Sequence, residues 1–138
     1  MFTKITVGYD GSDRAMRAVE EAADLATGLG AALHIVTAVP RDELHGFGSS
    51  SDQRWMSDTE IARDMLTNVA AKFSHLKVTI AAVQGSPATV LVNEADATAS
   101  DLIVVGNKNV QGITRILGCV AEGVAQKANC AVLISKTG

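Results

Sequence analysis

Two kinds of apolar pattern alternate along this 138-residue chain: short unbroken apolar runs, and stripes with helical spacing. Unbroken runs are typical of parallel strands that are covered on both faces. Apolar residues three and four positions apart are typical of amphipathic helices. The runs predict five strands, at residues 5–9, 31–39, 77–83, 101–105 and 131–135.

Four helices are predicted between the strands. The first follows Ser12, which suits an N-cap, and the third follows Ser86, another suitable N-cap, with Pro87 in its first turn. The segment 41–58 is polar and rich in Ser, Asp and Gly, and we expect a mobile loop there. The stripes place the helices at 13–27, from Ile61 to Phe73, from Pro87 to about Ala97, and from Cys119 onward.

The strict alternation of strands and helices predicts a single-domain α/β fold, with a parallel sheet and helices on both faces. Right-handed crossovers place the loops that follow the strands at one edge of the sheet, where such sheets bind ligands. Three features fall at this edge: Asp10 after the first strand, Val39 after the second, and a glycine loop from Gly106 to Gly118 after the fourth. Their convergence predicts a binding site.

The glycine loop carries Gly106, Gly112 and Gly118 and leads into the helix that begins at Cys119. Glycines let a backbone curl and approach a ligand closely, and a helix N-terminus adds unpaired N–H donors and the positive end of its dipole. This combination predicts that the chain binds a phosphorylated small molecule. Because a thiol at a helix N-terminus is also easier to oxidise, redox sensing at Cys119 is an alternative to a small residue filling a tight corner.

Composition limits the classes of function. With 47% hydrophobic and 20% charged residues, the chain has the composition of an ordinary globular protein, and its length suits one domain over residues 1–138. A net charge of −3 argues against nucleic-acid binding, and no apolar run approaches the ~18 residues of a membrane span. The chain begins without the apolar region of a signal peptide, and Cys119 and Cys130 fit neither a CxxC motif nor a disulfide framework. We therefore expect a cytoplasmic protein without nucleic-acid or membrane partners.

Several motifs, in chain order, resemble the universal stress protein family. The resemblance covers the whole chain and implies a Rossmann-like, five-stranded parallel sheet with strand order 3-2-1-4-5 and four helices. It also implies a role in the stress response and a homodimer, often formed through the last strand. The motifs are Gly8-Tyr9-Asp10-Gly11-Ser12, an alanine-rich first helix, Gly85-Ser86-Pro87, the strand from Asp101 to Gly106, and the strand from Cys130 to Ile134.

The family has members that bind ATP and members that do not. In the binders the loop resembles Gly, two residues, Gly, nine residues, Gly, then Ser or Thr. Here Gly106 and Gly118 match the outer glycines, but Asn109 replaces the middle one. Cys119 replaces the hydroxyl residue, and the loop is one residue short. Asn tolerates positive φ, so Asn109 can keep the turn, whereas a thiol is a weak donor. We expect the cleft to persist, with weakened affinity or a shift toward another adenine nucleotide.

Carried over by position, the resemblance implies a set of cofactor-binding residues. Asp10 would lie near the ribose and a metal-bound phosphate, Val39 would offer backbone groups to adenine, and Gly85 would lie at the ribose edge. The backbone N–H groups expected near the phosphates are those of Gly118, Cys119 and Val120.

The sequence thus predicts a universal-stress-type regulatory protein that binds ATP or another adenine nucleotide, with Mg²⁺ beside a triphosphate. Its output would be a change of conformation or of partner binding, because no positioned general base is evident and we do not expect an efficient enzyme. Two alternatives stay open: a nucleotide-independent dimeric interaction module, and a slow ATPase whose phosphate release would disappear in an Asp10→Ala variant.

Overall fold

Five parallel strands form the central sheet of the protein, in the order β5-β2-β1-β6-β7. The computed structural model describes residues 2–49, 53–107 and 117–136. Numbered along the chain within this sheet, the order is 3-2-1-4-5, so the predicted fold class and strand order are confirmed. The strands are β1 (Lys4–Gly8), β2 (Ala32–Val39), β5 (Val78–Gln84), β6 (Leu102–Asn107) and β7 (Ala131–Lys136).

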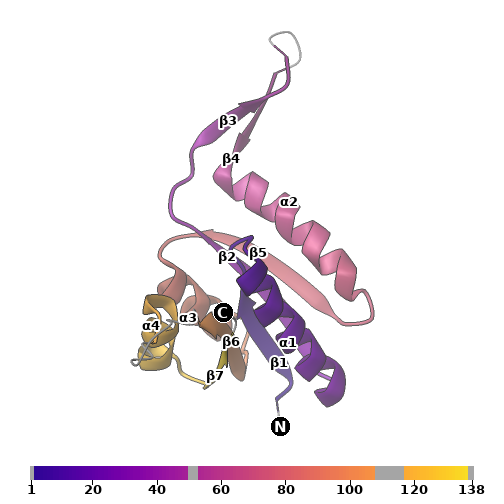
Figure 1. The fold of residues 1–138 in the computed structure, drawn as a ribbon, viewed down its shortest axis with the longest axis vertical. Helices are drawn as coiled ribbons and strands as arrows, with labels where there is room; N and C mark the ends of the chain where they lie inside the picture. Colours follow the sequence, from indigo (N-terminus) through magenta and orange to yellow (C-terminus); the bar gives the residue numbers. More distant parts are fainter. Residues whose placement is uncertain (1, 50–52, 108–116, 137–138) are drawn as a thin grey trace.

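Helices cover both faces of this sheet, as the alternation predicts (Figure 1). One core cluster joins α1 and α2 to strand residues such as Ile5 and Ile35, and the other joins α3 and α4 to residues such as Val36 and Ile103. Successive strand residues therefore point to opposite faces, each into its own core. The helices are α1 (Asp13–Leu29), α2 (Asp58–Ala70, continued by a 3₁₀ turn at Ala71–Phe73), α3 (Pro87–Ala97) and α4 (Cys119–Lys127).

The caps and the buried face of α1 explain why this part of the sequence forms a helix. Ser12 is the N-cap, and its Oγ accepts a hydrogen bond from the Ala15 N–H at 3.1 Å. Gly30 ends the helix with φ of +68°, the left-handed conformation that favours glycine. Alanines form most of the buried face, which lets the helix lie close to the sheet; the buried residues are Ala18, Val19, Ala22, Ala23 and Ala26.

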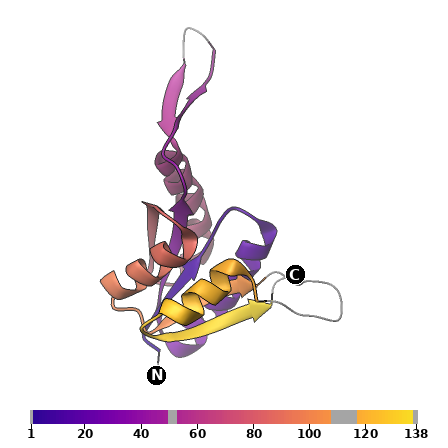
Figure 2. The ribbon, with the colours of Figure 1, turned by 90° about the vertical axis from the view of Figure 1, so that its left-hand side faces the viewer.

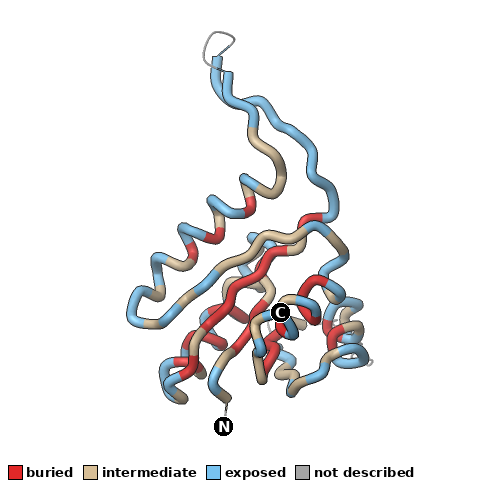
Figure 3. Tube along the Cα trace, turned by 180° about the vertical axis from the view of Figure 1, so that it is seen from behind, coloured by how far each residue is buried: buried red, intermediate tan, exposed pale blue. Residues whose placement is uncertain are grey.

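The prediction that residues 41–58 form a loop is wrong. It contains an antiparallel hairpin of two strands, β3 (Leu44–Phe47) and β4 (Arg54–Ser57). The hairpin projects away from the sheet above α2 (Figures 1 and 2), and its outer part is exposed throughout (Figure 3). Cross-strand hydrogen bonds rather than a buried face stabilise it, so the segment lacks the apolar alternation that marks a strand in sequence. Among the described residues, the helices are too short or too polar to cross a membrane.

Candidate functional site

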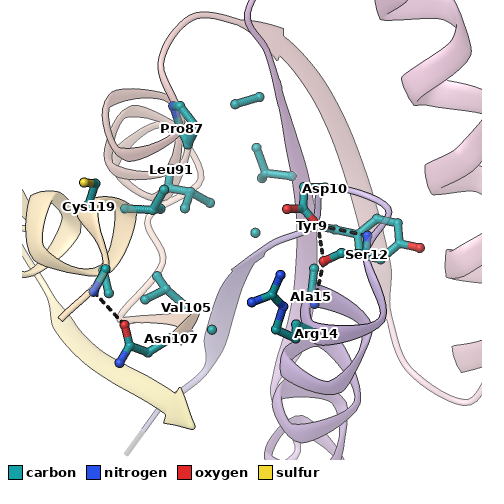
Figure 4. Close-up of a pocket in the computed structure, with 17 residues that line it drawn as sticks. Tyr9, Asp10, Ser12, Arg14, Ala15, Pro87, Leu91, Val105, Asn107 and Cys119 are labelled. Atoms are coloured by element: carbon teal, nitrogen blue, oxygen red, sulfur yellow. Dashed lines mark hydrogen bonds between the residues drawn. The ribbon is translucent and has the colours of Figure 1, made fainter. Parts of the chain in front are cut away.

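A cleft of about 380 Å³ opens at the carboxyl edge of the sheet, where β1, β2 and β6 end (Figure 4). The first turns of α1, α3 and α4 complete its walls. Of the three features predicted to meet at this edge, Asp10 and the two ends of the glycine loop, Gly106 and Gly118, line this cleft. Its lining residues are Gly8, Tyr9, Asp10, Ser12, Arg14, Ala15, Val36, Ala38, Pro87, Leu91, Val105, Gly106, Asn107, Gly118, Cys119, Val120 and Ala121.

Most of the site residues predicted from sequence meet in this cleft, and two lie beside it. Val39 and Gly85 are not part of the lining; the Gly85 N–H donates to the Val39 carbonyl oxygen at 3.0 Å. Val39 instead lines a second cavity, which adjoins the cleft at Ala38. Asn109 lies outside the described residues. The predicted residues that line the cleft are Asp10, Gly106, Gly118, Cys119 and Val120.

Asp10 is held in place by the turn that follows β1. Its Oδ1 accepts hydrogen bonds from the Ser12 N–H at 2.9 Å and from the Ser12 Oγ at 2.5 Å. Because Ser12 in turn caps α1, the carboxylate is oriented by the same turn that begins the helix. Asp10 is exposed at the cleft wall and is the one carboxylate among the described lining residues.

Asn107 is a site residue that sequence reasoning missed. Its side-chain Oδ1 accepts a hydrogen bond from the Gly118 N–H at 2.7 Å, which joins the end of β6 to the start of α4 (Figure 4). A Cβ on Gly118 would lie 3.2 Å from that oxygen, so a larger residue would crowd the contact. The Gly118 N–H, predicted to contact phosphate, therefore has a protein acceptor. Cys119 and Val120 begin the helix, where N–H groups have no partner within it.

Arg14 is the second residue that the sequence reasoning missed. It is exposed in the first turn of α1, and its guanidinium points into the cleft in Figure 4. A positive group thus lies in the same cleft as the N-terminus of α4. Its position four residues after Asp10, on a helix that starts at the binding edge, was the only sequence signal, because most helix arginines are simply solvated.

The remaining wall of the cleft is apolar. Leu91 on α3 and Val36 and Val105 on the strands are almost fully buried. A Cβ on Gly8 would lie 3.0 Å from Leu91 Cδ1, so glycine lets α3 pack close to the end of β1. The cleft therefore combines an apolar wall with a carboxylate, a guanidinium and a helix N-terminus. This combination suits an organic anion with an apolar part.

The fold and this cleft define a Rossmann-like α/β protein with its candidate site at the carboxyl edge of a parallel sheet. The model of the universal stress protein family matches residues 1–136. The chain therefore belongs to the universal stress protein family, as the sequence motifs indicated.

Individual relatives match over nearly the whole chain. Universal stress protein Rv1636 of Mycobacterium tuberculosis is 34% identical over 150 residues, with 99% of this chain and 97% of the relative covered. Universal stress protein MJ0531 of Methanocaldococcus jannaschii is 30% identical over 141 residues, covering 99% and 83%. A universal stress protein solved in complex with cAMP is 29% identical, with coverage of 99% and 98% and a TM-score of 0.73.

Proposed function

We propose that this chain is a regulatory protein that binds an adenine nucleotide in the cleft at the carboxyl edge of the sheet. The observation that carries the proposal is the arrangement of Asp10, Arg14 and the N-terminus of α4 around one apolar-walled cleft of about 380 Å³. That volume lies within the range of small-molecule sites. The related protein that was solved in complex with cAMP supports the choice of an adenine nucleotide.

The polar groups suggest how a nucleotide would lie. A phosphate is expected between the Arg14 guanidinium and the first turn of α4, because both favour an anion. The ribose is expected beside Asp10, whose carboxylate can accept hydrogen bonds from ribose hydroxyls. The adenine is then expected toward Ala38 and Val39, where the cleft adjoins the second cavity.

Asn107 affects the strength of such binding. A phosphate at α4 can accept hydrogen bonds from the Cys119 and Val120 N–H groups, but it gains the Gly118 N–H only if the Asn107 side chain releases it. A hydrogen bond to a charged group contributes about 1.5–3 kcal/mol, or roughly ten- to a hundredfold in affinity. We therefore expect weaker phosphate binding than a site with all three donors would give.

Mg²⁺ would accompany a triphosphate, and Asp10 fits a role beside it. Mg²⁺ takes oxygen ligands and commonly binds through one carboxylate together with substrate phosphates. The Asp10 carboxylate is exposed to the cleft and oriented by Ser12. Affinity for ATP, but not for AMP, is expected to rise with Mg²⁺, and this dependence is expected to be lost in Asp10→Asn.

The first experiment is native mass spectrometry of the freshly purified protein, followed by titration calorimetry with AMP, ADP, ATP and cAMP. We expect one bound adenine nucleotide per chain. Arg14→Ala should weaken binding of the preferred nucleotide about tenfold or more, because a charge-assisted phosphate contact is lost. Arg63→Ala, which removes an exposed arginine on α2, is the matched control and should bind as the wild type does.

Two results would overturn the proposal. One is a protein that retains no adenine nucleotide even at millimolar concentration, which would favour the nucleotide-independent interaction module. The other is a nucleotide that binds equally well to the wild type and to Arg14→Ala, which would place it outside this cleft.

A further inference from the structure

A second cavity, of about 410 Å³, lies where β2 ends, beside the base of the hairpin and the start of α2. Three of the side chains that line it are metal-ligating types: Glu43, His45 and Asp58. One ligand atom from each, two carboxylate oxygens and an imidazole nitrogen, lie within 4.8 Å of one another. Neither the cleft nor the proposed nucleotide uses these residues.

Hydrogen bonds hold the three residues close together without a bound ligand. The Asp58 N–H donates to the Glu43 carbonyl oxygen at 2.9 Å, and the Glu43 N–H donates to Asp58 Oδ2 at 3.0 Å. His45 Nε2 donates to Asp58 Oδ1 at 2.7 Å. The Thr59 N–H also donates to Asp42 Oδ1 at 3.1 Å. The segment between β2 and the hairpin is thus fastened to the first turn of α2, which fixes the backbone of Glu43 and Asp58 and orients the His45 ring.

The local charge favours a cation. Asp42, Glu43 and Asp58 bring three carboxylates to this end of α2, whereas Arg41 brings one positive charge, 3.5 Å from Glu43. The N-terminus of a helix adds about half a positive charge, so the balance stays negative.

We propose that Glu43, His45 and Asp58 form a binding site for a divalent transition-metal ion of the Zn²⁺ type. Imidazole nitrogen favours Zn²⁺ over Mg²⁺ and Ca²⁺, and carboxylate oxygens complete a common Zn²⁺ ligand set, with water as the fourth ligand. For binding, the proton on His45 Nε2 moves to Nδ1 or is released, so that Nε2 can donate its lone pair to the metal.

The geometry needs only small changes to accept the ion. Zn²⁺ lies about 2.0–2.2 Å from its nitrogen and oxygen ligands, which places tetrahedral ligand atoms roughly 3.3 Å apart. On binding, the distance between His45 Nε2 and Asp58 Oδ1 therefore increases from 2.7 Å. The distance between the two ligand atoms that lie furthest apart decreases from at most 4.8 Å. Glu43 and His45 are exposed, so their side chains can turn without disturbing a packed core.

Binding of the metal would fasten the hairpin to α2 more tightly. His45 lies on β3, opposite Met56 of β4, and Asp58 is the first residue of α2. The site shares its cavity with Val39, next to the cleft. This inference does not depend on nucleotide binding, because none of the three ligands lines the cleft.

The test is titration calorimetry of untagged, chelator-treated protein with ZnCl₂ in a background of millimolar Mg²⁺. We expect one Zn²⁺ per chain and a weakening of at least about tenfold in His45→Ala and in Asp58→Asn. The matched control is His75→Ala, which removes an exposed histidine that forms a hydrogen bond with Thr27 of α1 and is not one of the three proposed ligands. This variant should bind Zn²⁺ as the wild type does. Circular dichroism confirms that each variant is folded.

A second readout reports on the hairpin itself. Trp55, the only tryptophan in the chain, lies on β4 opposite Gly46, the residue after His45. Zn²⁺ should raise the fluorescence anisotropy of Trp55 in the wild type and leave it unchanged in His45→Ala. The proposal is overturned if the wild type binds no Zn²⁺, or if His45→Ala binds as well as the wild type. It is also overturned if binding disappears on alkylation of Cys119 and Cys130, which would assign the ion to the thiols.

Discussion

At the scale of single residues, Asp101 shows how one side chain fastens the start of the chain to the sheet. Its carboxylate accepts hydrogen bonds from the Thr3 N–H and Oγ1 and from the Lys4 N–H, at 2.8–3.1 Å. Burial raises the pKa of Asp101, but these hydrogen bonds together outweigh it, and the pKa is lowered from its ordinary 3.8.

Asp101→Asn should therefore lower the free energy of unfolding by about 1 kcal/mol at neutral pH. The expected loss is small for a charged hydrogen-bond acceptor because most of these bonds are exposed to solvent, which screens them. Because the folded pKa lies below the unfolded one, the contribution is complete above pH 3.8. It declines as the pH falls toward the folded value. Urea unfolding of both proteins between pH 2 and 7 measures the difference. Asp24→Asn, on the exposed face of α1, serves as the control, and a gap that stays constant down to pH 2 would contradict the explanation.

Single residues also show how far the site could be predicted from sequence. Asp10 and Gly118 were placed in the cleft because each directly follows a strand or precedes a helix, so local pattern and topology fix their positions. Asn107 could not be predicted, because its bond to Gly118 spans eleven positions and depends on the path of the chain between them. Arg14 could not be predicted either, because in the sequence it does not differ from a solvated helix arginine, and only the structure shows that it lines the cleft.

At the scale of elements, the helices and sheet strands were predictable because each buries an apolar face, whereas the hairpin buries none. Leu44 and Trp55, with 65% and 60% of their surface exposed, give β3 and β4 no inner side. Their pairing depends instead on backbone hydrogen bonds and on contacts with α2, such as that between His45 and Asp58. Such contacts leave no periodicity, so segment 41–58 looked like a loop.

The packing of α3 against α4 leads to a second prediction. A Cβ on Gly123 of α4 would lie 2.7 Å from the Cβ of Ala88 on α3, closer than real Cβ contacts come. Alanine favours a helix over glycine by about 1 kcal/mol, but overpacking costs about 1–3 kcal/mol. Gly123→Ala should therefore be destabilising by about 1 kcal/mol, and it should also displace the start of α4 at the cleft.

Gly28→Ala provides the matched comparison in urea or thermal unfolding. Gly28 lies in α1, with nothing within 4 Å of the added Cβ. The same substitution there should leave stability unchanged or raise it by up to about 1 kcal/mol. Equal effects at the two glycines would show that helix propensity, rather than the contact with Ala88, decides the result.

At the scale of the whole molecule, two exposed apolar surfaces are candidate interfaces for a homodimer. β7 lies at one edge of the sheet, paired only with β6 among the described strands, and Ile134 on it is 37% exposed. An edge strand offers unpaired N–H and C=O groups to another chain. The hairpin offers larger exposed side chains, namely Leu44, Phe47 and Trp55. Its two strands, however, are shorter edges, with four residues each against six in β7.

We predict a homodimer through β7, because pairing there would satisfy backbone groups as well as cover Ile134. Ile134→Lys should convert the dimer to a monomer in size-exclusion chromatography with light scattering, since a charge on the edge strand opposes pairing. Trp55→Ser, on the hairpin, should leave the dimer intact. Dissociation by Trp55→Ser alone would move the interface to the hairpin, and a wild type that is monomeric at every concentration would contradict the prediction. Since the hairpin is a two-stranded sheet of its own and β7 is an edge of the five-stranded sheet, the two variants separate these interfaces, and neither Trp55 nor Ile134 lines the cleft.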